Sequence, residues 1–444
     1  MTTEVILVKA AQLILSLSIL VVLHELGHFI PAKLFKTRVE KFYLFFDPWF
    51  SLFKFKKGET EYGVGWLPLG GYVKISGMID ESMDREQMAK PPQPWEFRSK
   101  PTWQRLIIMI GGVTVNILLA FFIYAMTLWV WGDTYLPNAS VKYGVVTDSL
   151  ARSIGMQDGD KIVAIDHRPV EKFESIAKNI LLHEAKSIQV NREGKELNLT
   201  VPEGFGNALL KQRGAFVMPR MPYIADSTRA GSAAAKVGVQ SGDRLIAING
   251  MDVPFYDQFA KEIKKHKSED VIVSVVRGKD TLNLAAKLSE KGEFGVYPRL
   301  MLNLDTTKYT FLQALPAGVS ESVDKLVSYV QQLRLIFVSK EVKVTESVGG
   351  FMTIGNLFPE MWDWRVFWEM TAFLSIVLAF MNILPIPGLD GGHVLFLLYE
   401  IVTGRKPNEK FMEYAQIAGM LILLSLLLFA NGLDLWRNLL KKFF

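Results

Sequence analysis

The sequence predicts a polytopic α-helical membrane protein with four transmembrane segments, a membrane-associated β-hairpin and two tandem α+β domains. Three observations support this fold class. Half of the 444 residues are hydrophobic and only 21% are charged. The hydrophobic residues gather in four long runs, and a phrase in the segment between the second and third runs recurs 83 residues later. This composition excludes a disordered chain, a coiled-coil rod and a collagen-like fibre.

Each apolar run reaches the roughly 20 residues that a helix needs to cross the core of a bilayer. The spans are expected within residues 1–35, 103–131, 364–403 and 414–436. One such run could be a buried helix of a soluble protein, but four in one chain favour a membrane protein. The first run lacks a basic leading region and a small-x-small cleavage site, so we interpret it as a retained span rather than a signal peptide.

Positive charge predicts the orientation in the membrane. Residues 36–105 hold 12 Lys and Arg residues, and the link after the third run adds Arg405, Lys406 and Lys410. Because cytoplasmic loops are enriched in these residues, both segments are expected in the cytoplasm, and the segment between the second and third runs outside it. Three basic residues near the C-terminal end favour the opposite orientation, and we give the two loops more weight.

The residue types available limit the chemistry. The chain has no cysteine, which excludes disulfides, thiolate metal sites, iron–sulfur clusters and cysteine nucleophiles. A metal ion must therefore be held by His, Asp or Glu, and there are six histidines. The formal charge of +5 is a mild excess that gives no argument for nucleic acid; beside apolar helices it suits contact with anionic lipid.

The soluble insert is duplicated. Residues 156–166 match residues 239–249 at a constant offset of 83, and both copies place Gly-Asp before an alternating apolar strand. A period of this length suits two tandem domains rather than a solenoid. A turn, a strand, a second turn and a short helical pattern predict small α+β domains at 132–213 and 214–305. A duplicated β domain of another class is the alternative.

Two more segments are expected at the membrane surface. Within the cytoplasmic segment 36–102, residues 61–75 predict a glycine-rich β-hairpin with aromatic sides. Within residues 306–363, the apolar residues of 319–337 follow helical spacing, which predicts an amphipathic helix on the outer membrane surface. Packing of this helix against the insert is an alternative that the sequence leaves open.

The first candidate for chemistry is His24-Glu25-Leu26-Gly27-His28. Residues four apart share one face of a helix, so both imidazoles can reach one ion, and Glu25 can approach a water bound to it. Two ordinary histidines at a helix end are the alternative. That alternative is disfavoured because ionisable groups inside a membrane-length apolar run are costly and usually functional.

A zinc site needs a third protein ligand, and Asp390 is the best candidate. It ends the sequence Asn382-Ile-Leu-Pro385-Ile-Pro387-Gly-Leu-Asp390 within the third apolar run. The prolines cannot continue a helix, and broken helices at membrane depth are tolerated where they line a buried or watery site. A solvated Asp at a helix end is the alternative.

Together these features resemble the site-2 protease family of intramembrane zinc proteases. The resemblance rests on two motifs, His-Glu-x-x-His in the first run and Asn-x-x-Pro-x-Pro-x-Leu-Asp-Gly in the third. The repeated Gly-Asp phrase resembles PDZ domains of bacterial envelope proteases. Four spans with two tandem PDZ domains after the second are similar to the RseP type within this family, the sigma-E regulator proteases. Val113 and Phe351 replace prolines that are usual in the family, a difference that concerns helix packing.

The resemblance implies His24, His28 and Asp390 as Zn²⁺ ligands and Glu25 as the catalytic base. Asn382 would hold or polarise the substrate backbone. The implied activity is cleavage within or near the transmembrane segment of single-span membrane proteins, such as an anti-sigma factor after a first cut on the outer side. The implied location is the bacterial inner membrane, with periplasmic PDZ domains that could bind peptide C-termini and an active site towards the cytoplasm. The hairpin would dip into the membrane.

Two other functions remain open. One is a membrane-anchored PDZ scaffold or chaperone with a vestigial metal site, which the intact His24, Glu25, His28 and Asp390 disfavour. The other is a metal transporter. Transporters usually contain inverted repeats, and we find none across the four runs.

Overall fold

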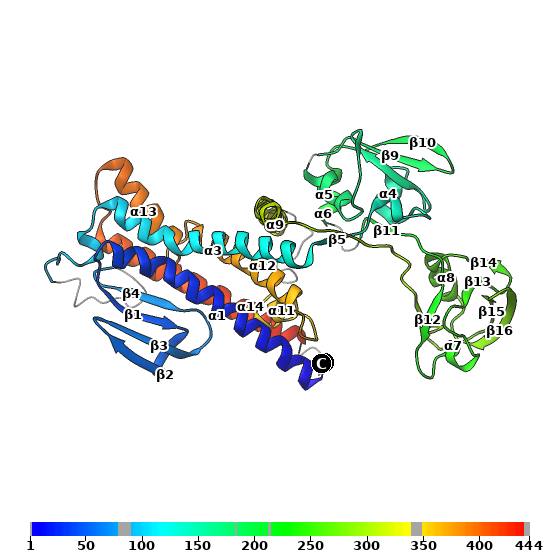
Figure 1. Ribbon diagram of the computed structural model, residues 1–444, viewed down its shortest axis with the longest axis horizontal. Helices are drawn as coiled ribbons and strands as arrows, with labels where there is room; N and C mark the ends of the chain where they lie inside the picture. The colour runs from blue at the N-terminus through cyan, green and yellow to red at the C-terminus, as the bar shows by residue number, and fades with distance from the viewer. Residues whose placement is uncertain (1, 79–89, 183, 212–214, 339–348, 439–444) are drawn as a thin grey trace. The chain divides into compact units, whose positions relative to one another are not determined.

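The computed structural model describes residues 2–78, 90–182, 184–211, 215–338 and 349–438 (Figure 1). The chain forms two compact units. The membrane unit comprises Met1–Gly132 and Lys308–Phe444, and the insert comprises Asp133–Thr307.

Four helices of the membrane unit are long and apolar enough to cross a membrane, among the residues described. They are α1 (Thr3–Leu34), α3 (Thr102–Trp131), α12 (Trp364–Ile383) and α14 (Glu409–Asn438). Many large apolar side chains on them are exposed, as a lipid-facing surface requires. The four apolar runs predicted from the sequence are therefore confirmed as helices, and the chain is an integral membrane protein.

The third span is shorter than residues 364–403, the range expected for it. Helix α12 ends at Ile383, and a separate helix, α13 (Asp390–Thr403), follows after a six-residue break, 384–389. Pro385 and Pro387 lack the N–H that a continuing helix would need, and Gly388 adopts a left-handed backbone angle (φ 97°). The predicted break is thus confirmed, and it places Asp390 at the first turn of a new helix.

Helix α3 lies at the centre of the membrane unit, in contact with α1, α12 and α13. Figure 1 shows it running beside α1. The two backbones touch at a pair of glycines: a Cβ atom at Gly27 would lie 2.4 Å from the carbonyl oxygen of Gly111, and one at Gly111 would lie 1.9 Å from that of Gly27. Only glycine permits this approach, because any side chain would force the helices apart.

The segment between α1 and α3 forms a four-stranded sheet in the order β2-β3-β1-β4. Its strands are β1 (Val39–Leu44), β2 (Phe46–Lys57), β3 (Thr60–Leu67) and β4 (Tyr72–Ile75). The expected hairpin over 61–75 is wrong: β1 lies between β3 and β4, parallel to the first and antiparallel to the second. The hairpin is β2–β3 instead. Strand β2 exposes a row of apolar side chains, Trp49, Phe50, Leu52, Phe53 and Phe55.

Residues 319–337 lie within helix α9 (Phe311–Val338), which confirms the predicted helix. It contacts α3 and α12: Gly318 packs against Ala125, and the Tyr329 ring meets Phe373 and Phe380 at 6.1 and 5.8 Å. The helix thus packs on the transmembrane helices, while its depth in the membrane stays a prediction. The described residues of this unit also form two short helices, η1 (Phe97–Ser99) and α11 (Phe351–Gly355).

The insert contains two copies of one small fold, which confirms the duplication. The four-stranded sheets have equivalent orders, β10-β9-β7-β8 and β16-β15-β13-β14, and each copy adds a two-stranded ladder, β11-β6 or β12-β17. Each copy also encloses its own apolar core. Strands β5 (Asp133–Tyr135) and β18 (Asp305–Thr307) pair with each other at the two ends of the insert.

Both copies are built from short strands and short helices. The first copy has β6 (Val145–Thr147), α4 (Ser149–Ser153), β7 (Lys161–Ile165), β8 (Arg168–Pro169), α5 (Ser175–Leu182), β9 (Ser187–Arg192), β10 (Lys195–Thr200), α6 (Phe205–Lys211) and β11 (Val217–Pro219), preceded by η2 (Asn138–Ser140). The second has β12 (Ala225–Thr228), α7 (Ala233–Lys236), β13 (Arg244–Ile248), β14 (Met251–Asp252), α8 (Tyr256–Ile263), β15 (Asp270–Arg277), β16 (Asp280–Lys287) and β17 (Val296–Pro298). Because β11 pairs with β6, strand pairing assigns β11 to the first copy, beyond the expected boundary at 213.

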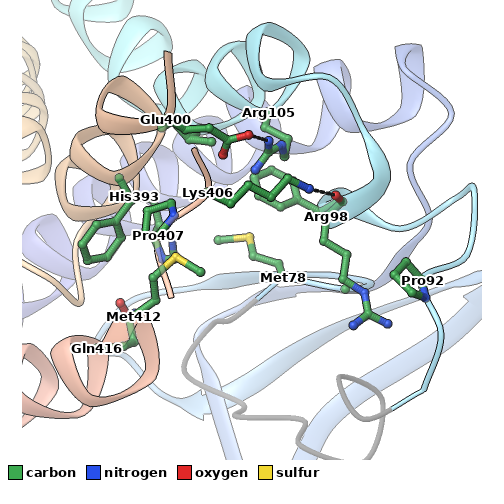
Figure 2. Close-up of a pocket in the computed structure, with 14 residues that line it drawn as sticks. Met78, Pro92, Arg98, Arg105, His393, Glu400, Lys406, Pro407, Met412 and Gln416 are labelled. Atoms are coloured by element: carbon green, nitrogen blue, oxygen red, sulfur yellow. Dashed lines mark hydrogen bonds and ion pairs between the residues drawn. The ribbon is translucent and has the colours of Figure 1, made fainter. Parts of the chain in front are cut away.

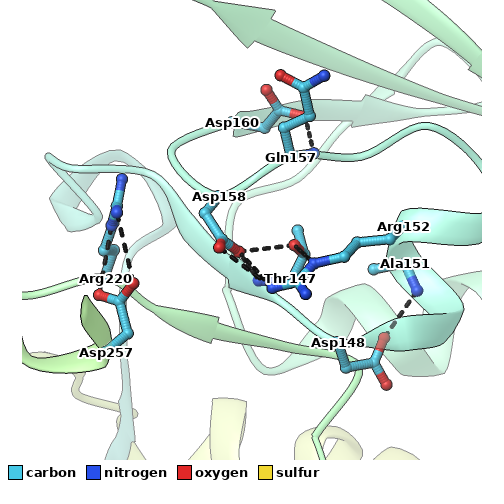
Figure 3. A network of polar contacts seen from close by, with 9 residues as sticks. All are labelled: Thr147, Asp148, Ala151, Arg152, Gln157, Asp158, Asp160, Arg220 and Asp257. Atoms are coloured by element: carbon cyan, nitrogen blue, oxygen red, sulfur yellow. Dashed lines mark hydrogen bonds and ion pairs between the residues drawn. The ribbon is translucent and has the colours of Figure 1, made fainter. Parts of the chain in front are cut away.

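An internal ion pair is repeated in the two copies. The buried carboxylates of Asp160 and Asp243 accept hydrogen bonds from the guanidinium Nε atoms of Arg192 and Arg277, at 2.7 and 2.8 Å. The Arg277 hydrogen bond holds the pKa of Asp243 below its usual value, so this carboxylate stays charged near neutral pH. Figure 3 shows Asp160 also accepting from the backbone N–H of Gln157. The Gly-Asp phrase therefore marks a structural anchor in each copy.

Candidate metal and catalytic site

Three side chains from distant parts of the sequence meet inside the membrane unit. His24 and His28 lie one turn apart on α1, and Asp390 begins α13. The Nε2 atom of each imidazole is 3.3 Å from Oδ2 of Asp390, and the two Nε2 atoms are 3.3 Å apart. The structure thus brings together the three residues that the sequence analysis singled out as ligands.

The chemistry of this cluster fits a zinc ion. Two imidazole nitrogens and one carboxylate oxygen form a ligand set that catalytic zinc sites use, and their ligand atoms lie within 4.8 Å of one another. The Oδ2 atom of Asp390 is buried and has no hydrogen-bond partner among the residues described. Its polar neighbours are the two imidazole Nε2 atoms at 3.3 Å. Buried polar atoms that meet without a hydrogen bond are costly, and a cation held between them would offset that cost.

Glu25 and Asn382 lie beside the cluster. Both line one cavity of about 800 Å³ together with His24, His28 and Asp390. Glu25 is buried, and Asn382 stands one residue before the end of α12, with its Nδ2 atom 3.3 Å from Nε2 of His24. All five residues predicted from the sequence therefore share one cavity.

Strand β4 forms part of the wall of this cavity, with Gly70 and Gly71 preceding it. Among the described strands β4 pairs only with β1, so its other edge is unpaired. Gly71 sits close to α1, where a Cβ atom would lie 2.6 Å from Cγ1 of Val21. The Tyr72 hydroxyl donates to Oδ1 of Asp47 at 2.8 Å, and burial raises the pKa of Tyr72, so it remains a donor.

Helix α3 supplies contacts that the sequence analysis missed. His28 Nδ1 is 2.8 Å from the carbonyl oxygen of Ile108, and His24 Nδ1 is 3.1 Å from the side-chain Nδ2 of Asn116. Between them, Gly112 leaves room for both rings: a Cβ atom there would lie 2.4 Å from Nε2 of His28. The signal in the sequence is the spacing of 108, 112 and 116, which puts all three positions on one helix face.

Helix α14 holds the break that precedes Asp390. The side-chain Oε1 of Gln416 accepts a hydrogen bond from the backbone N–H of Gly388 at 3.1 Å. One turn later, Gly419 packs against Pro387 so closely that a Cβ atom would lie 1.6 Å from the Pro387 oxygen. The fourth span thus fixes the position of the loop between α12 and α13.

A second cavity, of about 230 Å³, adjoins the first (Figure 2). The two share Met78, His393 and Gln416 as lining residues. At one edge of the second cavity, Arg105 of α3 pairs with Glu400 of α13 at 2.5 Å, which ties the helix that begins with Asp390 to the central helix. His393 lines both cavities but is not one of the three clustered ligand residues.

Comparison with known proteins finds a matching peptidase family and relatives that are named as proteases. A model of peptidase family M50 matches residues 12–426. A putative zinc metalloprotease of Treponema pallidum is 26% identical over 423 residues, which cover 91% of this chain and 93% of that one. A regulator of sigma E protease of Haemophilus influenzae is 27% identical, covering 96% and 98%. A putative zinc metalloprotease of Vibrio cholerae is 29% identical, covering 96% and 97%.

The close packing of Gly112 against the two imidazoles can be tested by substitution. Gly112→Ala should sharply lower the zinc content of the purified chain, because the new methyl group would overlap both rings. Gly432→Ala in α14 is the matched control, since no described atom apart from its chain neighbours and the backbone of its own helix lies within 4 Å of its Cβ position. Elemental analysis of the detergent-purified proteins measures the effect. Equal zinc content in both variants would contradict this reading of the site.

Proposed function

This chain belongs to peptidase family M50, the site-2 protease family of zinc metalloproteases, and we propose that it cleaves single-span membrane proteins within or near their transmembrane segments. The observation that carries the proposal is the convergence of His24, His28 and Asp390, with Glu25 and Asn382, in one cavity built from membrane helices.

We assign the roles of the site residues as follows. His24, His28 and Asp390 would hold the zinc ion, which when bound supplies a Lewis acid for water and for the scissile carbonyl. The Glu25 carboxylate takes the proton of the attacking water and passes it to the leaving amide nitrogen. Nδ2 of Asn382 donates a hydrogen bond to the carbonyl oxygen as negative charge develops on it.

We propose that the substrate is bound as an added strand. A transmembrane helix hides its carbonyl groups in its own hydrogen bonds, so it must unwind before cleavage. The unpaired edge of β4 can bind the backbone groups that unwinding frees, because it offers backbone N–H and C=O groups and lines the cavity. The alternative is a sheet that only anchors the chain at the membrane, for which the exposed apolar row on β2 is suited.

We propose a bacterial inner-membrane location, with the active site towards the cytoplasm and the insert in the periplasm. The charge of residues 36–105 supports this orientation. Relatives from Haemophilus influenzae and Salmonella typhimurium are named regulators of sigma E protease, which supports a substrate of the anti-sigma-factor type. The two copies in the insert are proposed to be PDZ domains.

We further propose that the insert is a sieve that excludes substrates with large outer domains. It lies in the sequence between the second and third spans and contains no cluster of potential metal ligands among its described residues. Recruitment of a newly exposed C-terminus by the repeat domains is the alternative. The Asn-Gly turn of the second copy has a counterpart in the first, since Asp166 and His167 also adopt left-handed angles (φ 47° and 63°).

The base can be tested by Glu25→Gln. This variant should keep its zinc, because the ligands remain, and should lose cleavage of a purified single-span test substrate, because an amide cannot accept the proton. Glu4→Gln, an exposed change in the first turn of the same helix, should behave as wild type. Cleavage by Glu25→Gln at near the wild-type rate would rule out the proposed mechanism.

The sieve can be tested by deletion. Because Tyr135 and Asp305 are paired neighbours on β5 and β18, residues 136–304 can be replaced by Asn-Gly, a two-residue hairpin turn. A sieve predicts faster cleavage of untrimmed substrates by the deletion variant, whereas a recruiter predicts slower cleavage of trimmed ones. Zinc content serves as the control for folding of the membrane unit. Unchanged cleavage of untrimmed substrate by a zinc-loaded deletion variant would count against the sieve.

A further inference from the structure

The second nitrogen of a metal-binding imidazole decides how well the first one binds. A ligand Nε2 must be free of its proton, so Nδ1 carries it and needs an acceptor. His28 meets this requirement, because a carbonyl oxygen can only accept and the Ile108 carbonyl lies 2.8 Å from Nδ1. That contact fixes the tautomer of His28 with Nε2 towards Asp390.

His24 has its own partner on the same helix. Its Nδ1 atom lies 3.1 Å from the side-chain amide of Asn116, which is completely buried. The amide presents Nδ2 to the ring, and its Oδ1 has no hydrogen-bond partner among the described residues. Because Oδ1 has no bond to lose, rotating the amide by half a turn places it as the acceptor for the Nδ1 proton.

The backbone of Asn116 is held by helix α12. Its backbone oxygen accepts a hydrogen bond of 2.7 Å from the Ser375 hydroxyl of α12. Helices α1 and α3 are antiparallel here. The contact of His28 with Ile108 therefore lies on one side of the Gly27–Gly111 contact, and that of His24 with Asn116 lies on the other. One face of α3 therefore contacts both histidines.

We propose that Asn116 is a positioning residue, which holds His24 in the tautomer and orientation needed to bind zinc through Nε2. The inference rests on the proposed role of His24 as a ligand. Asn116 does not line the substrate cavity; it acts through the imidazole, in the way that hydrogen-bond partners of metal ligands raise affinity and fix ring orientation.

The experiment uses four variants of the full-length chain, purified in detergent. N116L keeps a side chain of similar size without an acceptor, N116A removes it, and N116D supplies an acceptor that needs no rotation. T127A is the matched control, a buried polar residue of α3 whose hydroxyl bonds the Tyr124 carbonyl. Zinc affinity is measured by competition with a chelator, and the visible spectrum of the cobalt-substituted protein reports the ligand geometry.

The inference predicts that N116L and N116A bind zinc about 10- to 100-fold more weakly than wild type, with a changed cobalt spectrum. N116D should restore wild-type affinity and spectrum, and T127A should leave both unchanged. Wild-type affinity in N116L and N116A would overturn the inference. So would equal weakening in N116D and N116L, which would indicate a packing role.

Misfolding of N116L or of N116A leaves the comparison intact, because both variants lack an acceptor and either one can be compared with N116D and T127A. The outcome also separates this inference from the proposed function. A wild-type chain that binds zinc and cleaves its substrate, beside an N116L variant of equal zinc affinity, contradicts the positioning role alone. A wild-type chain without zinc affinity contradicts the ligand assignment and this inference with it.

Discussion

The site depends on the contact between the backbones of α1 and α3 at Gly27 and Gly111. At this point neither helix has room for even a methyl group. The contact lies within the motif His24-Glu25-Leu26-Gly27-His28, so the same residue spacing that aligns the imidazoles also brings α3 against them. The Ile108 carbonyl and the Asn116 side chain can reach the rings only because the helices are this close.

The other half of the site comes from an interruption. Pro385 and Pro387 end α12, and Asp390 starts α13, so the carboxylate enters the bundle at a helix N-terminus. Negative charge is favoured there, since the first N–H groups of a helix have no partners within it. The Arg105–Glu400 pair anchors α13, and the Gln416 contact holds Gly388 within the break. A rigid frame therefore surrounds a short irregular segment.

The sequence was sufficient for much of this arrangement. Four spans, the break at Pro385 and the duplicated insert follow from local rules: apolar length, the missing proline N–H and repeat spacing. Helix periodicity pairs His24 with His28, whereas Asp390 was predicted as the third ligand from its setting in an apolar run and from the resemblance to the site-2 protease family. The predicted hairpin over 61–75 was wrong. Strand β1 lies between β3 and β4, and no local sequence pattern in β3 or β4 indicates that a strand from earlier in the chain pairs between them. Asn116 was missed because an amide in an apolar helix looks the same whether it bonds a ligand or a neighbouring carbonyl.

The central claim is that His24, His28 and Asp390 hold one zinc ion. Zinc K-edge X-ray absorption on the purified chain tests it most directly. The account predicts two imidazole ligands and an oxygen shell at about 2.0–2.2 Å, together with loss of most bound zinc in Asp390→Ala, because two histidines alone hold the ion poorly. Full zinc occupancy in Asp390→Ala, with an absorption spectrum identical to that of wild type, would contradict it.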